Sequence, residues 1–144
     1  MVHALQEVWR VLASDGRLLD SREIASHSRV EVVAGEQVMV AGATDDSVYI
    51  PDDVACDQAL AQILAEGWFE FERRVFFDTA WHYDSLATLK EQFEADRIII
   101  SESVLAQAQE LLTRGGADAQ VRYITKTLVA RYRKLPRQAN HSGV

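Results

Sequence analysis

The spacing of apolar residues changes along this chain from the helical period to the strand period. Residues 4–12 have helical spacing, and the polar segment 14–16, which ends in Gly, predicts the end of that helix. A strand is then expected over 17–21. A helix that leads directly into a strand is typical of a mixed α and β fold. The apolar face of the helix consists of Leu5, Val8, Trp9 and Leu12.

Two β-branched segments follow, over 29–33 and 37–41, and a third short one covers 47–50. The link between the first two contains Gly35, which predicts a β-hairpin. Three more helices are expected further along, because polar or proline start signals precede apolar residues at helical spacing. The start signals are Pro51 with Asp52 or Asp53, then Ser85, then Ser101, and the stop signals include Gly67 and Gly115-Gly116.

The segment 69–83 alternates between apolar and polar residues for longer than a typical strand. This pattern predicts one long strand with a single buried face. Arg73 and Phe76 interrupt the alternation, so each is a candidate β-bulge. A last strand is expected over 120–132, where Thr and Val are frequent. The face expected to be buried carries Phe69, Phe71, Val75, Phe77, Thr79, Trp81 and Tyr83.

These elements predict an α/β or α+β fold with about four helices and an added hairpin. At 144 residues the chain has the length of one ordinary domain, which we place at 1–135 and follow with a disordered tail over 136–144. The net charge of −7 argues against nucleic-acid binding, which needs clustered Lys and Arg. No apolar run reaches the length of a membrane span, and a single cysteine excludes an internal disulfide, so a cytoplasmic location is the simplest expectation.

The N-terminal segment resembles the class I S-adenosylmethionine-dependent methyltransferases, in which a sequence of this type forms the helix and strand just after the cofactor pocket. The matching residues are Leu5, Glu7, Val8, Arg10, Val11, Leu12, Gly16, Leu18 and Leu19. The resemblance is strongest over 3–20 and looser beyond. It implies a partial Rossmann-like sheet with mixed strands, in which strand 17–21 lies beside 120–132, and 120–132 pairs antiparallel with 69–79.

In that family a Gly-rich turn and an acidic residue hold the cofactor, and both precede the matching segment. The chain has no G-x-G spacing that could build such a turn. The resemblance therefore implies the C-terminal half of a methyltransferase fold without its own cofactor site, and we assign no catalytic, cofactor-binding or metal-binding residue. No cofactor is expected unless a partner completes the S-adenosylmethionine site.

Candidate chemical groups are few. Asp78 and His82 lie on the same strand face about 13 Å apart, too far for a direct hydrogen bond. His82 and Asp84 are closer and could form an acid–base pair, although a solvated strand end explains both residues equally well. Cys56 lies near a helix start, where amide dipoles favour a thiolate, but a structural thiol is the preferred interpretation.

Two larger groups of side chains have similar alternatives. The aromatic residues of 68–83 could line an apolar pocket, although they are more often a simple core. A basic cluster at the end of the last strand, Arg131, Arg133, Lys134 and Arg137, is interpreted as a solvated strand end.

Three functional hypotheses remain. The first is a methyltransferase-like protein without a cofactor site that acts as a binding or regulatory module. The second is part of an active methyltransferase, as a fragment or completed by a partner. The third is a small α+β ligand-binding fold in which the N-terminal match is accidental. An unpaired edge at 17–21 favours a homodimer, or a protein that supplies the missing half, as the partner.

Overall fold

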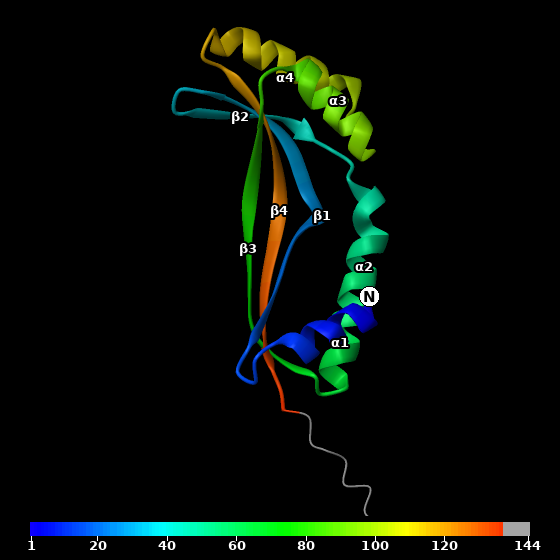
Figure 1. The fold of residues 1–144 in the computed structure, drawn as a ribbon. Coiled ribbons are helices and arrows are strands. Elements are labelled where there is room, and N and C mark those ends of the chain that lie inside the picture. Colours follow the sequence, from blue (N-terminus) through cyan, green and yellow to red (C-terminus); the bar gives the residue numbers. More distant parts are fainter. Residues whose placement is uncertain (137–144) are drawn as a thin grey trace, which may run out of the picture. The chain divides into compact units, whose positions relative to one another are not determined.

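The computed structural model describes residues 1–136 (Figure 1). Within them the chain is a mixed α and β structure, with four α-helices and one four-stranded sheet. The elements are α1 (Val2–Val11), β1 (Arg17–Ala34), β2 (Gln37–Ala43), a 3₁₀ turn η1 (Ser47–Tyr49), α2 (Ile50–Ala65), β3 (Phe69–Tyr83), α3 (Leu86–Asp96), α4 (Glu102–Gly115) and β4 (Gln120–Lys134). The expected tail falls, apart from Pro136, on residues outside the described part.

The sheet has the strand order β2-β1-β4-β3. This order confirms that the strand beginning at 17 lies beside the last strand, which in turn lies beside β3. Neighbouring strands run antiparallel, whereas mixed directions were expected. The reason is the connection from β3 to β4. It contains two helices, α3 and α4, so the chain returns to the end of the sheet where β3 stopped and β4 runs back beside it (Figure 1).

The prediction of separate strands at 17–21 and 29–33 was wrong, because both belong to the single strand β1. Within β1, His27 has a φ of 56°, a left-handed conformation that His tolerates better than β-branched residues. The hairpin between β1 and β2 is confirmed, with antiparallel pairing from Arg29 opposite Ala43 to Ala34 opposite Gln37. Gly35 in its turn has a φ of 59°.

The β-branched run 47–50 forms the turn η1 and the first residue of α2, and not a strand. The Asp45 side chain accepts a hydrogen bond from the Ser47 amide at 2.9 Å, which folds the backbone into a local turn. Pro51 then lies in the first turn of α2, where its missing N–H costs nothing. Local hydrogen bonding therefore outweighs β propensity here.

The chain forms two compact units. Unit 1 comprises Met1–Arg22, Asp52–Val75 and the described residues from Leu128, and unit 2 comprises Glu23–Pro51 and Phe76–Thr127. In unit 1, the Trp9 and Trp68 rings meet edge to face at 5.2 Å, and the Trp9 indole donates to the Leu135 carbonyl at 3.0 Å. These contacts anchor α1 within its unit.

Unit 2 has its own hydrophobic core, to which β1, β4 and the two helices α3 and α4 contribute. The Phe93 ring of α3 meets the Tyr123 ring of β4 edge to face at 4.7 Å. Helix α4 contacts β2, and Gly42 lies so close to Val104 that an added Cβ would come within 2.5 Å of its methyl group. The buried members of the core are Val30, Val32, Leu89, Phe93, Ala108, Leu111, Val121 and Tyr123.

The buried face expected for β3 was wrong over most of its length. Phe69 is buried, but Phe71, Phe77 and Trp81 are 45%, 48% and 50% exposed. The cause is the position of β3 at the end of the sheet, where it has a strand neighbour on one side only. Alternation along the sequence reports the two faces of a strand and does not reveal whether a layer covers either face.

Candidate functional site

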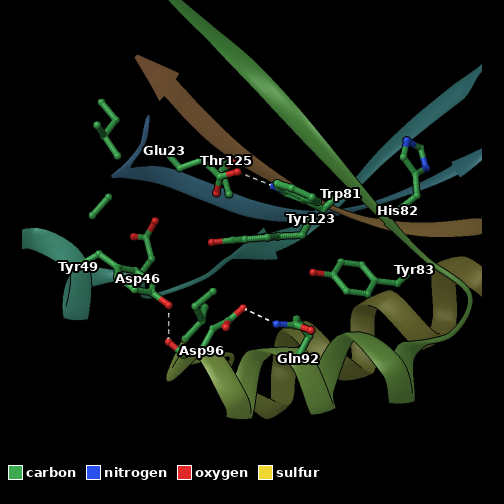
Figure 2. Close-up of a pocket in the computed structure, with 13 residues that line it drawn as sticks. Glu23, Asp46, Tyr49, Trp81, His82, Tyr83, Gln92, Asp96, Tyr123 and Thr125 are labelled. Carbon is green, nitrogen blue, oxygen red and sulfur yellow. Dashed lines mark hydrogen bonds between the residues drawn. The ribbon is translucent and has the colours of Figure 1, made fainter. Parts of the chain in front are cut away.

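The candidate site is a cavity of about 470 Å³ in unit 2 (Figure 2). Such a volume accommodates a small organic molecule. Aromatic side chains and a few polar groups form its wall, which is the usual composition of a small-molecule site. The lining residues are Glu23, Ile24, Ala25, Asp46, Tyr49, Trp81, His82, Tyr83, Gln92, Asp96, Ile98, Tyr123 and Thr125.

Strand alternation brings the aromatic part of the wall together. Trp81 and Tyr83 are two residues apart on β3, and Tyr123 and Thr125 are two residues apart on the neighbouring strand β4. Residues at this spacing project from the same face of a sheet. Figure 2 shows the rings of Tyr83 and Tyr123 extending into the site with their hydroxyl groups foremost.

Helix α3 and the segment around η1 supply the opposite wall. Gln92 and Asp96 are four residues apart on α3 and therefore share a helix face. The Gln92 amide donates to Asp96 Oδ2 at 2.8 Å. The Tyr49 hydroxyl donates to the backbone carbonyl of Asp96 at 2.7 Å, so η1 is fastened to the C-terminal end of α3. The Tyr49 bond holds the two segments of this wall together, and the Gln92 bond orients the Asp96 side chain.

Three carboxylates belong to the lining, each held by a neighbour. Glu23 Oε1 accepts a hydrogen bond from the Trp81 indole at 2.7 Å. Asp46 Oδ2 accepts one from the Ser28 hydroxyl, and Ser28 is only 1% exposed. Asp96 Oδ2 accepts from Gln92, as above. The carboxylates are therefore oriented before any ligand arrives.

Burial and the nearby carboxylates raise the pKa values of the three tyrosines of the lining. Burial raises the pKa of the Tyr49 hydroxyl, and the charge of Asp96 raises it further. The pKa of Tyr83 is raised by burial, then by Asp96 and Glu23. Burial also raises the pKa of Tyr123, and Asp46 and Glu23 add to that effect. All three hydroxyl groups are therefore neutral hydrogen-bond donors at physiological pH.

Thr125 is the least expected member of the wall. Its side chain is 4% exposed, and its hydroxyl oxygen has no hydrogen-bond partner among the described residues. A buried hydroxyl without a partner costs about 1–3 kcal/mol. The oxygen is itself inaccessible to solvent, so it lies behind the cavity surface and is not offered to a bound molecule.

The acid–base candidates from the sequence do not form a pair in the structure. Asp78 is held by Arg29 at 3.1 Å and by Lys126, and these two bases lower the pKa of its carboxyl, Lys126 most strongly. His82 lines the cavity, but its ring points away from the other labelled side chains (Figure 2). Over residues 1–136, no hydrogen bond or ion pair joins His82 to Asp78 or Asp84.

Cys56 lies in the second turn of α2 and not at its start. It is a free, half-buried thiol in unit 1, beside a cavity of about 270 Å³. The other residues that line this cavity are mostly apolar, and such surroundings are those of a structural thiol. Among residues 1–136, no group of three or more His, Cys, Asp or Glu side chains could hold a metal ion.

In the basic cluster at the end of β4, Arg131 and Arg133 are about half exposed, as expected for a solvated strand end, and both are also paired. Arg131 contacts Glu72 at 2.7 Å, and Arg133 contacts Glu70, so carboxylates of β3 neutralise both. The Lys134 ammonium lies 4.4 Å from the centre of the Trp9 ring and donates to the Leu12 carbonyl at 2.6 Å. Arg137 lies outside the described residues. The cluster therefore ties β4 to β3 and α1 within unit 1.

The chain matches no family model, no curated protein and no solved structure in the comparisons with known proteins. None of the helices described over residues 1–136 combines the length and the apolar character needed to cross a membrane.

Sequence reasoning found only part of this site. The aromatic run at 68–83 included Trp81 and Tyr83, which do line the cavity, although a core was the preferred interpretation. The carboxylates at 23, 46 and 96 come from distant segments, and no spacing in the sequence connects them. Gln92 and Asp96 did carry a usable signal, because their spacing of four places two polar groups on one helix face.

Proposed function

We propose that this chain is a binding module whose unit 2 takes up a small organic molecule in the cavity described above. This is the third of the functional hypotheses drawn from the sequence, a small α+β ligand-binding fold. The observation that carries the proposal is the cavity of about 470 Å³ itself, whose wall combines aromatic rings with three carboxylates that neighbouring donors hold in place. A concave site with an apolar lining and a few oriented polar groups is the usual form of a small-molecule site.

The chemistry of the lining favours binding over catalysis. His82, the lining side chain best suited to acid–base work, is turned away (Figure 2), and the three carboxylates are held by neighbouring donors. The resemblance to methyltransferases is strongest over residues 3–20, which belong to unit 1 and contribute nothing to the cavity lining. The proposal does not rest on that resemblance, and a role within an active methyltransferase stays a prediction. We further propose a cytoplasmic location, which the single cysteine supports.

The test follows the indole N–H signals of the three tryptophans by NMR. Trp81 lines the cavity, whereas Trp9 and Trp68 lie together in unit 1. The probes are three molecules with one phenyl body and different head groups: phenethylammonium, 2-phenylethanol and 3-phenylpropanoate. At least one should shift the Trp81 signal and leave the other two indole signals in place.

Two variants locate the binding. Ala25→Phe places a ring in the cavity and should abolish the Trp81 response, while Ala106→Phe, the same change on the exposed surface of α4, should not. If no probe shifts Trp81, or if Ala25→Phe leaves the Trp81 response unchanged, the proposal fails.

A further inference from the structure

The charged side chains that line the cavity have one sign, while Arg97, which directly follows α3, places a positive charge near Tyr49. Glu23, Asp46 and Asp96 are the charged residues of the lining, and no Lys or Arg is among the described residues that form it. The imidazole of His82 points away from the site (Figure 2). A cleft with charges of one sign and walls of low dielectric constant concentrates ligands of the opposite sign.

Each carboxylate keeps one oxygen available. Glu23 is bonded through Oε1, and Asp46 and Asp96 through Oδ2. Over the described residues, the second oxygen of each of the three accepts no hydrogen bond from the protein. A carboxylate can accept several hydrogen bonds. The available carboxylate oxygens are therefore the hydrogen-bond acceptors of the site, and tyrosine hydroxyl groups belong to the same lining.

The end of α3 adds to the same field. Asp96 is the last residue of this helix, and its own carbonyl accepts the Tyr49 hydroxyl. The C-terminus of a helix carries a partial negative charge from its unpaired carbonyl groups, and cations are favoured there. The field at this wall therefore has two sources, the carboxylate side chains and the backbone.

The aromatic rings provide a second means of holding a cation. Trp81, Tyr49, Tyr83 and Tyr123 come from three different segments and all line the cavity. The faces of aromatic rings attract ammonium groups, and Trp does so most strongly. Figure 2 shows the indole of Trp81 above the phenol rings of Tyr123 and Tyr83, with Glu23 beside the indole and with Asp46 and Asp96 on the other side of the site.

We propose that the ligand of this cavity is a small organic cation, with an ammonium head group on an apolar or aromatic body. The inference rests on the proposed binding function and names the class of ligand. The ammonium group donates to an available carboxylate oxygen of the lining, and the field of the other carboxylates favours it further. The body contacts the rings and Ile98.

Isothermal titration calorimetry with the three matched probes tests this inference. Phenethylammonium should bind about tenfold more tightly than 2-phenylethanol, a difference of about 1.4 kcal/mol, and 3-phenylpropanoate should bind most weakly. Raised salt should weaken binding of the cation and leave the alcohol unaffected.

Matched charge variants assign the effect to the site. Asp96→Asn and Glu23→Gln should each lower the affinity for phenethylammonium about tenfold and leave the affinity for 2-phenylethanol unchanged. Glu94→Gln removes the same charge from an exposed position on α3 outside the lining and should change neither. If the alcohol or the carboxylate shifts Trp81 and binds as tightly as the ammonium compound, the cation inference is overturned while the binding function stands. If none of the three binds, both are overturned.

Discussion

At the scale of single residues, Gly16 and Gly67 were both expected to end helices, and only one of them adopts the left-handed conformation. Gly67 has a φ of +71°, and a Cβ added there would meet no atom within 4 Å, so only its backbone conformation restricts substitution. Gly16 is not left-handed. There an added Cβ would lie 2.9 Å from the Ala13 carbonyl oxygen and 3.1 Å from the Leu12 Cβ. The two positions require glycine for different physical reasons.

Gly67→Val and Gly16→Val should therefore both destabilise the protein. Left-handed strain costs about 1–2 kcal/mol at Gly67, and overpacking costs about 1–3 kcal/mol at Gly16. Gly67→Asn should recover much of the loss, because Asn tolerates positive φ, whereas Gly16→Asn should not. Urea midpoints measure both effects. Equal recovery by Asn at the two sites would contradict this assignment of causes.

The buried hydroxyl of Tyr123 predicts a response to alkaline pH. Its pKa is raised in the folded state, mainly by burial, so the folded chain holds the proton more tightly than the unfolded chain. The contribution to stability is complete below the unfolded pKa of about 10 and is lost as the pH rises through the folded pKa. Tyr123→Phe should flatten the fall in urea midpoint between about pH 9 and 11. An unchanged fall in the variant would contradict the prediction.

At the scale of elements, the helix caps are the features that the sequence specified best. Ser85 and Ser101 were expected to begin helices, and in the structure their side chains accept the amides of Thr88 at 3.1 Å and Val104 at 3.3 Å. Capping is a local interaction between residues three apart, so a short sequence window contains all of it.

Ser85→Ala should consequently cost about 1 kcal/mol of stability, because the Thr88 amide loses its acceptor. Ser85→Asp retains an acceptor at the same place and should restore the wild-type urea midpoint. Ser14→Ala, at an exposed serine in the turn after α1, provides a control without a capping role. Equal losses in the Ala and Asp variants would show that Ser85 contributes through something other than its cap.

The strands were predictable in order but not in number, extent or burial. Alternation indicated β3, the frequent Thr and Val residues indicated β4, and the neighbours of β1 and β4 were as expected. β1 continues through 22–28 because it pairs with other strands of the sheet. A short window of the sequence does not contain the residues of those strands. The exposure of β3 depends on its place at the end of the sheet. Glu23, Asp46 and Asp96 line one cavity because the tertiary fold brings three distant segments together. No short window of the sequence contains that information.

At the scale of the whole molecule, the outer strand β3 is the best candidate for association with a second copy of the chain. Association was expected through the edge at 17–21 or the helix that precedes it, and Trp9 of that helix is occupied within unit 1 by Trp68 and the Leu135 carbonyl. Trp9→Glu would therefore test the fold of that unit and not an interface. By contrast, Phe76 and Phe77 on β3 are 53% and 48% exposed, and an end strand offers unpaired backbone groups.

The sequence of β3 is complementary to itself about Phe76, the central residue of Phe69–Tyr83. If two copies pair antiparallel around a two-fold axis at Phe76, Arg74 of each lies opposite Asp78 of the other. The same register places Val75 opposite Phe77. The symmetry of the strand therefore supports the homodimer that was expected from the sequence, with a different edge at the axis.

Arg74→Asp should shift this equilibrium toward the 16.2 kDa monomer, because two pairs of like charges would then face each other across the axis. Arg73→Asp makes the same change of charge one residue away, opposite Thr79, and should leave the mass nearly unchanged. Light scattering coupled to size exclusion measures the mass of each variant. A wild-type chain that remains monomeric at high micromolar concentration would show instead that the charged residues of β3 protect this edge from pairing, as charges on edge strands commonly do.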